Sequence, residues 1–402
     1  MTEETRDVSC CVVGGGPGGA TLAYLLARKG ISVLLLEAHR DFAREFRGDT
    51  IHPSILEILE DLGLAERLLA LPHAKIRRIA AQTPGGARRV MVDFGRLPTR
   101  YPYIAMLPQE RFLEFLTGEA KRFPSFRLEM GARVEGLLER DGRVTGVRVR
   151  EGEGMREVRA LLTVGADGRF SAVRRLAGLE TVRTSPPMDV LWFRIPRRPE
   201  DADPEEGRLW TGRGRLLVTL DRGSHWQIGF VIPKGGYEAL RAAGLEGLRR
   251  AIVEVAPEFG DRVGEIRDWK EVSLLSVESS RVRRWWKRGL LLIGDAAHAM
   301  SPVAGVGINM AIQDAVVAAE ELAAPLAAGT LEDRSLASVQ RRRERPTRLV
   351  QAVQAFVQRR LVARALDART RGTLPLFVRL PFVRRFISRF VAFGIGRVRV
   401  RA

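Results

Sequence analysis

The chain has 402 residues, of which 45% are hydrophobic, so it is long enough for two domains or one large α/β body and too apolar to be disordered. Its formal net charge is +18, but residues 335–402 hold 17 arginines and two acidic residues, which places +15 in the last sixth of the chain. The remainder is nearly neutral, which argues against a protein-wide nucleic-acid surface and predicts no nucleic-acid partner.

The location of the protein is indicated by its cysteines and its apolar runs. Cys10 and Cys11 are adjacent in one expected strand and are poor disulfide partners, which predicts a reduced, cytoplasmic compartment. The acidic start MTEETRDV is unlike a signal peptide. No run of 18 apolar residues occurs, so we expect no membrane-spanning helix.

A strand, a glycine-rich turn and a helix open the chain. The apolar segment Val8–Val13 is an expected strand, followed by the turn Gly14–Gly19 and the helix Ala20–Arg28. The second strand, Ile31–Leu36, is apolar throughout, as a strand buried on both faces should be, and it ends at Glu37. This order is the βαβ pattern of a dinucleotide-binding fold.

The glycines have the spacing Gly14-x-Gly16-x-x-Gly19. The first permits a tight turn, the second lets backbone N–H groups approach a pyrophosphate, and the third allows close helix–strand packing. Glu37 stands where a carboxylate can accept hydrogen bonds from a ribose. A glycine loop without a ligand is the alternative, but strand, helix and acid in register favour a dinucleotide site.

The middle of the chain continues this alternation. We expect helices at Pro53–Leu62 and Glu110–Arg122 and a hairpin over Ile76–Phe94 with its turn at Pro84–Gly86. We expect strands at Phe126–Val134 and Glu157–Val164, and a pair of strands over Glu135–Val149 joined by a turn at Asp141–Gly142.

A β-rich insert follows. Pro186–Pro233 is rich in aromatic and β-branched residues and predicts antiparallel strands of a smaller domain. We then expect a helix at Tyr237–Ala256, strands at Val272–Val282 and Gly289–Ile293, and a helix at Met310–Ala323.

The segment after the last strand is rich in glycine. Gly305 and Gly307 allow a backbone to approach a flat ring, and a helix start near Asn309, the only asparagine in the chain, places a positive dipole end there. Asn309 is expected to cap the helix or fix the backbone, and an ordinary cap without a ligand is the alternative. His298 is interpreted as a structural histidine that braces the loop.

Three signatures stand in order: GGGPGG at Gly14–Gly19, GADG at Gly165–Gly168 and GDAAHAMSPVAGVGIN at Gly294–Asn309. Together they closely resemble the single-component flavin monooxygenases of the para-hydroxybenzoate hydroxylase type, over about residues 5–345. The resemblance implies an α/β fold with a Rossmann-like, parallel-sheet FAD-binding domain (1–75, 100–180, 282–345). A β-rich substrate domain (76–99, 181–281) interrupts it, and a basic helical segment (346–402) follows.

The resemblance also implies the residues that hold FAD. The pyrophosphate is expected at Gly14, Gly16, Pro17, Gly18 and Gly19, the adenosine ribose at Glu37, other polar contacts at Arg47 and Gln109, the adenine at the backbone of Val134, both FAD and the nicotinamide at Asp167 and Gly168, the ribityl chain at Gly294 and Asp295, and the flavin ring at Pro302, Gly305, Gly307, Ile308 and Asn309.

The implied activity is monooxygenation. NADPH or NADH reduces FAD, O₂ forms a flavin hydroperoxide, and one oxygen atom reaches an aromatic or lipophilic, electron-rich substrate. The sequence identifies no catalytic residue, no metal ligand and no oligomeric state beyond monomer or homodimer. Two alternatives stay open: an FAD-dependent prenyl-chain reductase, and a flavin-binding regulatory protein without catalysis.

The basic end of the chain has two interpretations. Pro375–Ala402 alternates bulky apolar residues with arginine. Such a segment can lie at the inner face of a membrane as a peripheral contact. Alternatively, it packs on the FAD domain with a solvated arginine face.

Overall fold

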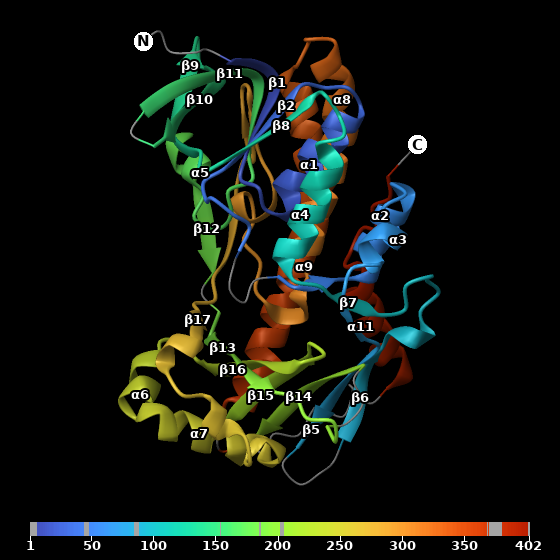
Figure 1. Ribbon diagram of the computed structural model, residues 1–402, viewed down its shortest axis with the longest axis vertical. Helices are drawn as coiled ribbons and strands as arrows, with labels where there is room; N and C mark the ends of the chain where they lie inside the picture. The colour runs from blue at the N-terminus through green and yellow to red at the C-terminus, as the bar shows by residue number, and fades with distance from the viewer. Residues whose placement is uncertain are drawn as a thin grey trace.

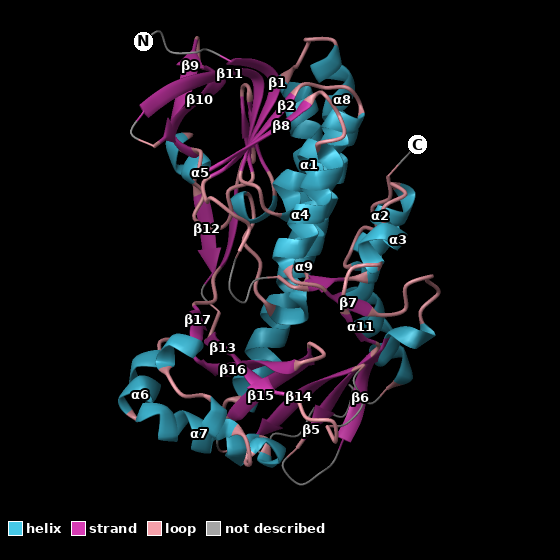
Figure 2. Ribbon diagram, in the orientation of Figure 1, coloured by secondary structure: helices cyan, strands magenta, loops and turns pink. Residues whose placement is uncertain are grey.

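The computed structural model describes residues 6–43, 48–83, 88–152, 154–184, 186–201, 205–367, 369 and 380–400. Two lobes lie one above the other in the view of Figure 1. The upper lobe is a sheet flanked by long helices, and the lower lobe is a second sheet with short helices on its outer side (Figure 2). The expected hairpin turn Pro84–Gly86 and the expected site residue Arg47 lie outside the described residues.

The upper sheet has eight strands, with the order β19-β20-β11-β1-β2-β8 and a β9–β10 hairpin on β11. Neighbours from β20 to β8 run parallel, as expected of a Rossmann-like sheet. Their bounds are β1 Arg6–Val13, β2 Val33–Glu37, β8 Phe126–Met130, β9 Arg133–Arg140, β10 Arg143–Glu151, β11 Gly154–Gly165, β19 Trp286–Lys287 and β20 Leu290–Leu292.

The register of this sheet brings its functional turns to one edge. Val13 at the end of β1 pairs with Gly165 of β11 and with Leu36 of β2. Parallel strands end at the same edge, so the glycine turn, the GADG turn and the acid of β2 meet there. Three helices, α1 (Pro17–Arg28), α4 (Gln109–Ala120) and α8 (Gly307–Ala327), pack beside the sheet and bury its apolar face.

The lower sheet has seven strands in the order β17-β13-β16-β15-β14-β5-β6. Alternate residues on each strand face opposite sides, so Leu191 and Phe193 enter an aromatic core under α7 while Val190 and Trp192 face the other way. The bounds are β5 Arg78–Gln82, β6 Arg88–Asp93, β13 Met188–Pro196, β14 Glu206–Gly212, β15 Arg215–Asp221, β16 His225–Pro233, β17 Ser273–Leu275, α6 Tyr237–Ala242 and α7 Gly244–Val255.

Smaller elements connect the lobes. A two-stranded ribbon, β12 (Thr181–Thr184) with β18 (Ser279–Val282), runs between them. The rest are β3 Thr50–Ile51, β4 Ala74–Ile76, β7 Ile104–Met106, α2 Pro53–Asp61, α3 Ala65–Leu69, α5 Ala172–Leu176 and 3-10 turns at Phe94–Arg96, Pro257–Phe259, Val263–Glu265, Trp269–Glu271, Gly294–Ala296 and Val303–Gly305.

The C-terminal helices span both lobes. Helix α9 (Asp333–Val357) runs from the upper to the lower lobe and continues as a π-helical turn, Gln358–Val362, and α10 (Ala363–Ala365) (Figure 1). Helix α11 (Pro381–Phe393) lies beside β6 and α2. After it the chain returns to α2, where Arg397 pairs with Glu57.

Several elements end differently from the sequence-based expectation. The strand expected to reach Val134 ends at Met130, because the chain turns at Gly131, which has φ +73°. Val134 belongs to the next strand, β9, which begins at Arg133. The single helix expected over 237–256 is divided at Gly244, which has φ +72°. The strand expected over 272–282 is two strands, β17 and β18, in different sheets.

Candidate functional site

One continuous cavity of about 1540 Å³ connects the two lobes. It begins at the glycine turn after β1, passes the start of α8 and ends against the lower sheet. The expected site residues among its walls are Gly14, Gly16, Pro17, Gly18, Glu37, Gln109, Val134, Asp167, Gly168, Gly294, Asp295, Pro302, Gly305, Gly307 and Ile308. Gly19 and Asn309 lie behind the wall.

The glycine turn shows why each position lacks a side chain. Gly14 has φ +106°, and a Cβ there would lie 2.5 Å from the carbonyl oxygen of Ala166. A Cβ at Gly19 would lie 2.0 Å from the carbonyl oxygen of Gly14. Gly16, by contrast, has no atom within 4 Å of its Cβ position. The first and third glycines therefore serve packing, and the second faces open space at the N-terminus of α1.

Glu37 closes this end of the cavity. It is 7% exposed, and its Oε2 accepts a hydrogen bond from the N–H of Gly15 at 2.9 Å. Its Oε1 accepts from the backbone N–H of His39 at 2.9 Å and lies 2.6 Å from the His39 ring Nδ1. The acid therefore fixes the glycine turn from the end of β2 while it lines the cavity.

The side chain of Asp167 binds the start of helix α5, which follows it in the chain. Its carboxylate accepts hydrogen bonds from the N–H groups of Ala172 and Val173, at 2.7 and 3.1 Å, and from the Ser171 hydroxyl at 2.5 Å. These are the free donors at the start of α5, so the side chain acts as a helix cap. Gly168, with φ +80° and open space at its Cβ position, leaves the backbone exposed to the cavity.

A buried ionic network supports the third glycine-rich segment from behind. Asp314 on α8 accepts from the N–H of Gly294 at 3.0 Å and from Arg343 Nε of α9 at 2.7 Å, and its Oδ2 lies 2.6 Å from His298 Nε2. Burial raises the pKa of Asp314, but its interactions with His298 and Arg343 outweigh burial and hold that pKa below its ordinary value. His298 also packs on Trp285 and does not line the cavity, which confirms its structural role.

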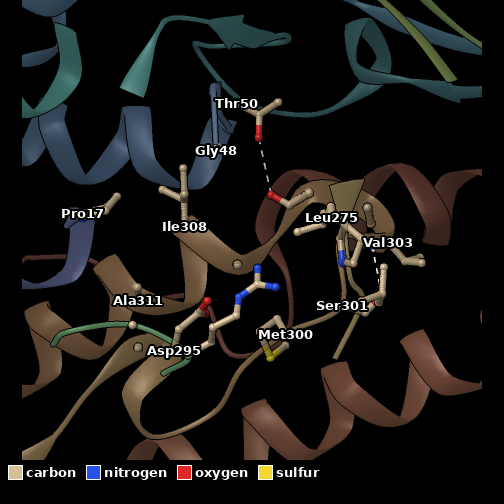
Figure 3. A pocket seen from close by; sticks show the side chains of 18 of the residues that line it. Pro17, Gly48, Thr50, Leu275, Asp295, Met300, Ser301, Val303, Ile308 and Ala311 are labelled. Atoms are coloured by element: carbon tan, nitrogen blue, oxygen red, sulfur yellow. Dashed lines mark hydrogen bonds between the residues drawn. The ribbon is translucent and has the colours of Figure 1, made fainter. Parts of the chain in front are cut away.

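The loop before α8, residues 301–305, lines the cavity and forms a ledge in its wall. Ala304 and Gly305 both have positive φ, 66° and 63°, and the Thr50 hydroxyl donates to the Gly305 carbonyl at 3.5 Å (Figure 3). A Cβ at Gly305 would lie 3.3 Å from Thr50 Oγ1 and 3.4 Å from His52 Nε2. The absence of a side chain at Gly305 suits this tight path and its positive φ.

The expected capping role of Asn309 is wrong. Helix α8 begins at Gly307, and its N-cap residue, Val306, has no side chain that could cap it. Asn309 lies in the first turn, 1% exposed, and both of its side-chain amide atoms lack a partner within the described residues. The N–H groups of this first turn have no acceptor inside the helix, and they add to its positive end.

The sequence analysis expected the β-rich insert to face the substrate but missed the part that α9 and α11 take in the cavity wall. Trp192, Leu216 and Val231 of the lower sheet line the cavity, and so do Val353, Gln354 and Val357 of α9 and Phe386, Ile387 and Phe390 of α11. The only sequence signal for α11 is the alternation of apolar residues with arginine, and α9 has no comparable signal. Trp226 faces the other side, where it belongs to the core of the lower lobe and donates from Nε1 to Asp201 at 2.7 Å.

The residues present fit FAD. Three glycine-containing turns meet around one elongated cavity, an acid ends the second strand, and the open position at Gly16 faces the positive start of α1. The Gly305–Gly307 segment leaves room for a flat ring beside the positive start of α8. The fold and this site define a flavin-dependent hydroxylase class of protein.

Comparison with known proteins also indicates a flavin-dependent hydroxylase. The FAD binding domain family matches residues 7–353, and the chain belongs to this family. The 6-methylpretetramide 4-monooxygenase of Streptomyces rimosus is 35% identical over 98% of this chain and 94% of its own length. The solved structure of OxyS anhydrotetracycline hydroxylase from the same species has a TM-score of 0.74 and 27% identity, covering 96% of this chain and 76% of that one.

A relative with another activity is less similar. Digeranylgeranylglycerophospholipid reductase 2 of Methanothermobacter thermautotrophicus is 29% identical over 82% of each chain. The greater similarity to monooxygenases supports that function over a prenyl-chain reductase: the chain is an FAD-dependent monooxygenase, with NAD(P)H as the reductant typical of this class.

Within the described residues, one segment, Val303–Ala327, is long and apolar enough to span a membrane, and 67% of its most apolar window is buried in the protein.

Proposed function

We propose that this monooxygenase hydroxylates a large, flat, largely apolar aromatic substrate. The observation that carries the proposal is the size and position of the cavity. At about 1540 Å³ it exceeds the range of roughly 300–1,000 Å³ that one drug-sized ligand occupies, which leaves room for a substrate beside the cofactor. The name of the most similar relative reported above, a 6-methylpretetramide 4-monooxygenase, supports an aromatic substrate.

The residues proposed to hold FAD follow from the three turns. The backbone of Gly14–Gly18 at the start of α1 binds the pyrophosphate, and Glu37 binds the ribose. Gln109, Val134, Gly168, Gly294 and Asp295 complete the adenosine and ribityl contacts, and Pro302, Gly305, Gly307 and Ile308 bind the ring. Because Asn309 Nδ2 and Oδ1 lie behind the wall, its part in this proposal is its backbone N–H in the first turn of α8.

Activation of O₂ with two electrons from NADPH or NADH is the chemistry that FAD supplies when bound. The protein contributes electrostatics and exclusion of water. The first turn of α8 presents its N–H groups and dipole to the ring, which favours negative charge there. The apolar strands β13, β15 and β16 and helices α9 and α11 keep bulk water from the reacting face.

The test of this function is oxygen consumption coupled to a hydroxylated product. FAD-loaded protein is expected to oxidise NADPH or NADH faster when a fused-ring phenol is present than when a single-ring phenol is present. The product should gain one oxygen atom by mass spectrometry in ¹⁸O₂. Reduction of a carbon–carbon double bond without oxygen uptake would contradict the proposal and favour a reductase.

We propose, separately, peripheral membrane contact from the cytoplasmic side. Helix α11 exposes Phe382 (70%) and Phe386 (58%) beside the exposed Arg385 and Arg389, a composition typical of interfacial helices. Anionic liposomes are expected to co-sediment with the full chain and less with a Phe382→Ser/Phe386→Ser variant. Equal binding to neutral and anionic liposomes, or none to either, would contradict the contact.

A further inference from the structure

Three glutamines lie on one face of α9 and of the π-helical turn that continues it. Gln351, Gln354 and Gln358 are spaced by three and four residues, which places them one above another along the helix. Gln354 is 1% exposed and Gln358 is 4% exposed. Buried amides need hydrogen-bond partners, so the partners of this glutamine row show what the helix face holds.

The glutamine row binds the segment that forms the ledge. Gln354 Nε2 donates to the carbonyl oxygens of Ser301 and Val303, each at 2.9 Å. Gln358 Nε2 donates to the hydroxyl of Ser301. One turn earlier, Gln351 Nε2 donates to the carbonyl oxygen of residue 299 at 3.3 Å. The backbone of residues 299–303 is therefore fastened to one helix through every second carbonyl.

The same face of α9 also holds the helix into which the ledge leads. Arg343, about two turns before the glutamine row, donates from Nε to Asp314 at 2.7 Å and from Nη2 to Gln313 at 3.0 Å, both on α8. Between these two attachments the chain passes Ala304, which has φ +66°. A residue with a Cβ keeps such a conformation only where its surroundings fix it, and α9 supplies that support on both sides.

Helix α9 contributes to the cavity wall as well. Val353 and Val357, each next in sequence to a glutamine of the row, line the cavity beside the ledge. The row ends where the π-helical turn begins, at Gln358, and π-helical turns recur at functional sites. One helix therefore fixes the ledge and forms the wall next to it.

We infer that Gln354 and Gln358 are positioning residues for the flavin ring: they hold the ledge in its binding shape before FAD arrives. The inference rests on the proposed function, in which the ring lies on Pro302 and the residues that follow it. A ledge that is already ordered costs no ordering free energy when the ring binds, so the glutamine row strengthens FAD binding without touching FAD.

The test compares two ligands of the full-length protein after its FAD has been removed. ADP carries only the part of FAD proposed to bind at the glycine turn and Glu37, whereas FAD adds the ribityl chain and the ring. We expect Gln354→Met, which keeps the side-chain length but loses both bonds, to bind FAD about tenfold more weakly and ADP within twofold of the unaltered protein. Gln358→Met, which loses one bond, should weaken FAD about threefold. Flavin fluorescence measures FAD binding, and calorimetry measures ADP binding.

Two control variants bracket this result. Gln340 is another glutamine of α9, and its Nε2 donates to the carbonyl oxygen of Arg283 at 2.9 Å, outside the cavity wall. Gln340→Met should change neither affinity. Glu37→Gln, at the other end of the cavity, should weaken ADP and FAD alike.

A milder change covers the case in which Gln354→Met does not fold and so binds no ADP. Ser301→Ala removes the hydroxyl that Gln358 binds and keeps the backbone carbonyls. It should weaken FAD about threefold, as Gln358→Met does, and combining the two changes should add no further loss.

The inference is overturned if the variants of the glutamine row weaken ADP as much as FAD, or if they weaken neither. If it fails in this way while a fused-ring phenol is still hydroxylated, the proposed function stands. If the unaltered protein binds FAD no tighter than ADP, the ring makes no contact at the ledge, and the ring site in the proposed function is overturned together with the inference.

Discussion

The end of the cavity proposed to hold the cofactor and the end proposed to hold the substrate are built by opposite means. At the proposed cofactor end, backbone groups of short glycine-containing turns line the cavity, and the sequence marks these turns with glycine and acidic residues. At the proposed substrate end, side chains from the lower sheet, α9 and α11 line the cavity, from positions as distant in the sequence as Trp192 and Phe390. Backbone chemistry therefore leaves a local signature, whereas a wall assembled by tertiary packing leaves none.

The network around Asp314 holds α9 and the Gly294 turn against α8, and its loss has the largest expected effect. Asp314→Asn leaves Arg343, which is 1% exposed, without a carboxylate, and we expect a loss of about 3–5 kcal/mol in the free energy of unfolding. FAD retention should fall as well, because Asp314 accepts a hydrogen bond from Gly294, which lines the cavity.

The control for Asp314→Asn is a more exposed ion pair between the same two helices, α8 and α9. Glu320→Gln removes the negative charge that pairs with Arg342, whose side chain is 38% exposed, and should change stability by less than about 1 kcal/mol. Urea unfolding of both variants measures the difference. Similar losses for the two variants would contradict a special contribution of the buried network to stability.

The pH dependence of stability tests the buried, neutral state of His52 in the cavity wall. Burial lowers its pKa from 6.5 to about 4, so the unfolded chain binds more protons between these values and stability falls as pH falls through that window. The decline is expected to reach roughly 3 kcal/mol, about 1.4 kcal/mol per pH unit. His225, with its pKa also lowered to about 4 by burial and by Arg194 and Arg222, adds a slope of the same sign.

His52→Asn should remove the larger, buried share of this slope and leave the part due to His225. Denaturant unfolding at pH 7, 6, 5 and 4 gives both curves. An unchanged slope in the variant would contradict the neutral, buried assignment of this ring.

Gly14 and Gly16, which are separated by one residue, test the backbone end of the cavity. Gly14→Ala forces a side chain into a φ of +106° and against the Ala166 carbonyl, which should cost about 2–3 kcal/mol of stability and abolish FAD retention. Gly16→Ala meets no atom and should leave thermal unfolding nearly unchanged while it still weakens FAD, because the new methyl group lies where the pyrophosphate is proposed. Equal stability of both variants would contradict the division between packing and binding glycines.

The contrast between backbone turns and a wall of side chains also explains how much of this molecule the sequence could predict. The parallel sheet, the β-rich insert and the meeting of Gly14, Gly168 and Asp295 at one cavity were accessible, because each depends on local pattern and strand order. The position of Asn309 was not, since the start of α8 at Gly307 is set by the ledge that precedes it. Phe386 and Gln354 were also out of reach, because no spacing in the sequence shows which helix face turns toward the lower sheet.

The smallest expected effect sharpens the contrast at α11, where two exposed phenylalanines lie one turn apart. Phe386 lines the cavity and is 58% exposed, whereas Phe382 is 70% exposed and does not line it. Phe386→Ala should weaken anthracene and anthraquinone binding by about threefold to tenfold through lost apolar contact, with FAD retention unchanged. Phe382→Ala should leave probe binding as it is, and both should unfold within about 0.5 kcal/mol of the unaltered protein. Titrating the FAD-loaded variants with anthracene decides between the two: if they behave alike, Phe386 covers the surface of the protein rather than the proposed substrate, and the share of α11 in this wall would rest on Ile387 and Phe390 alone.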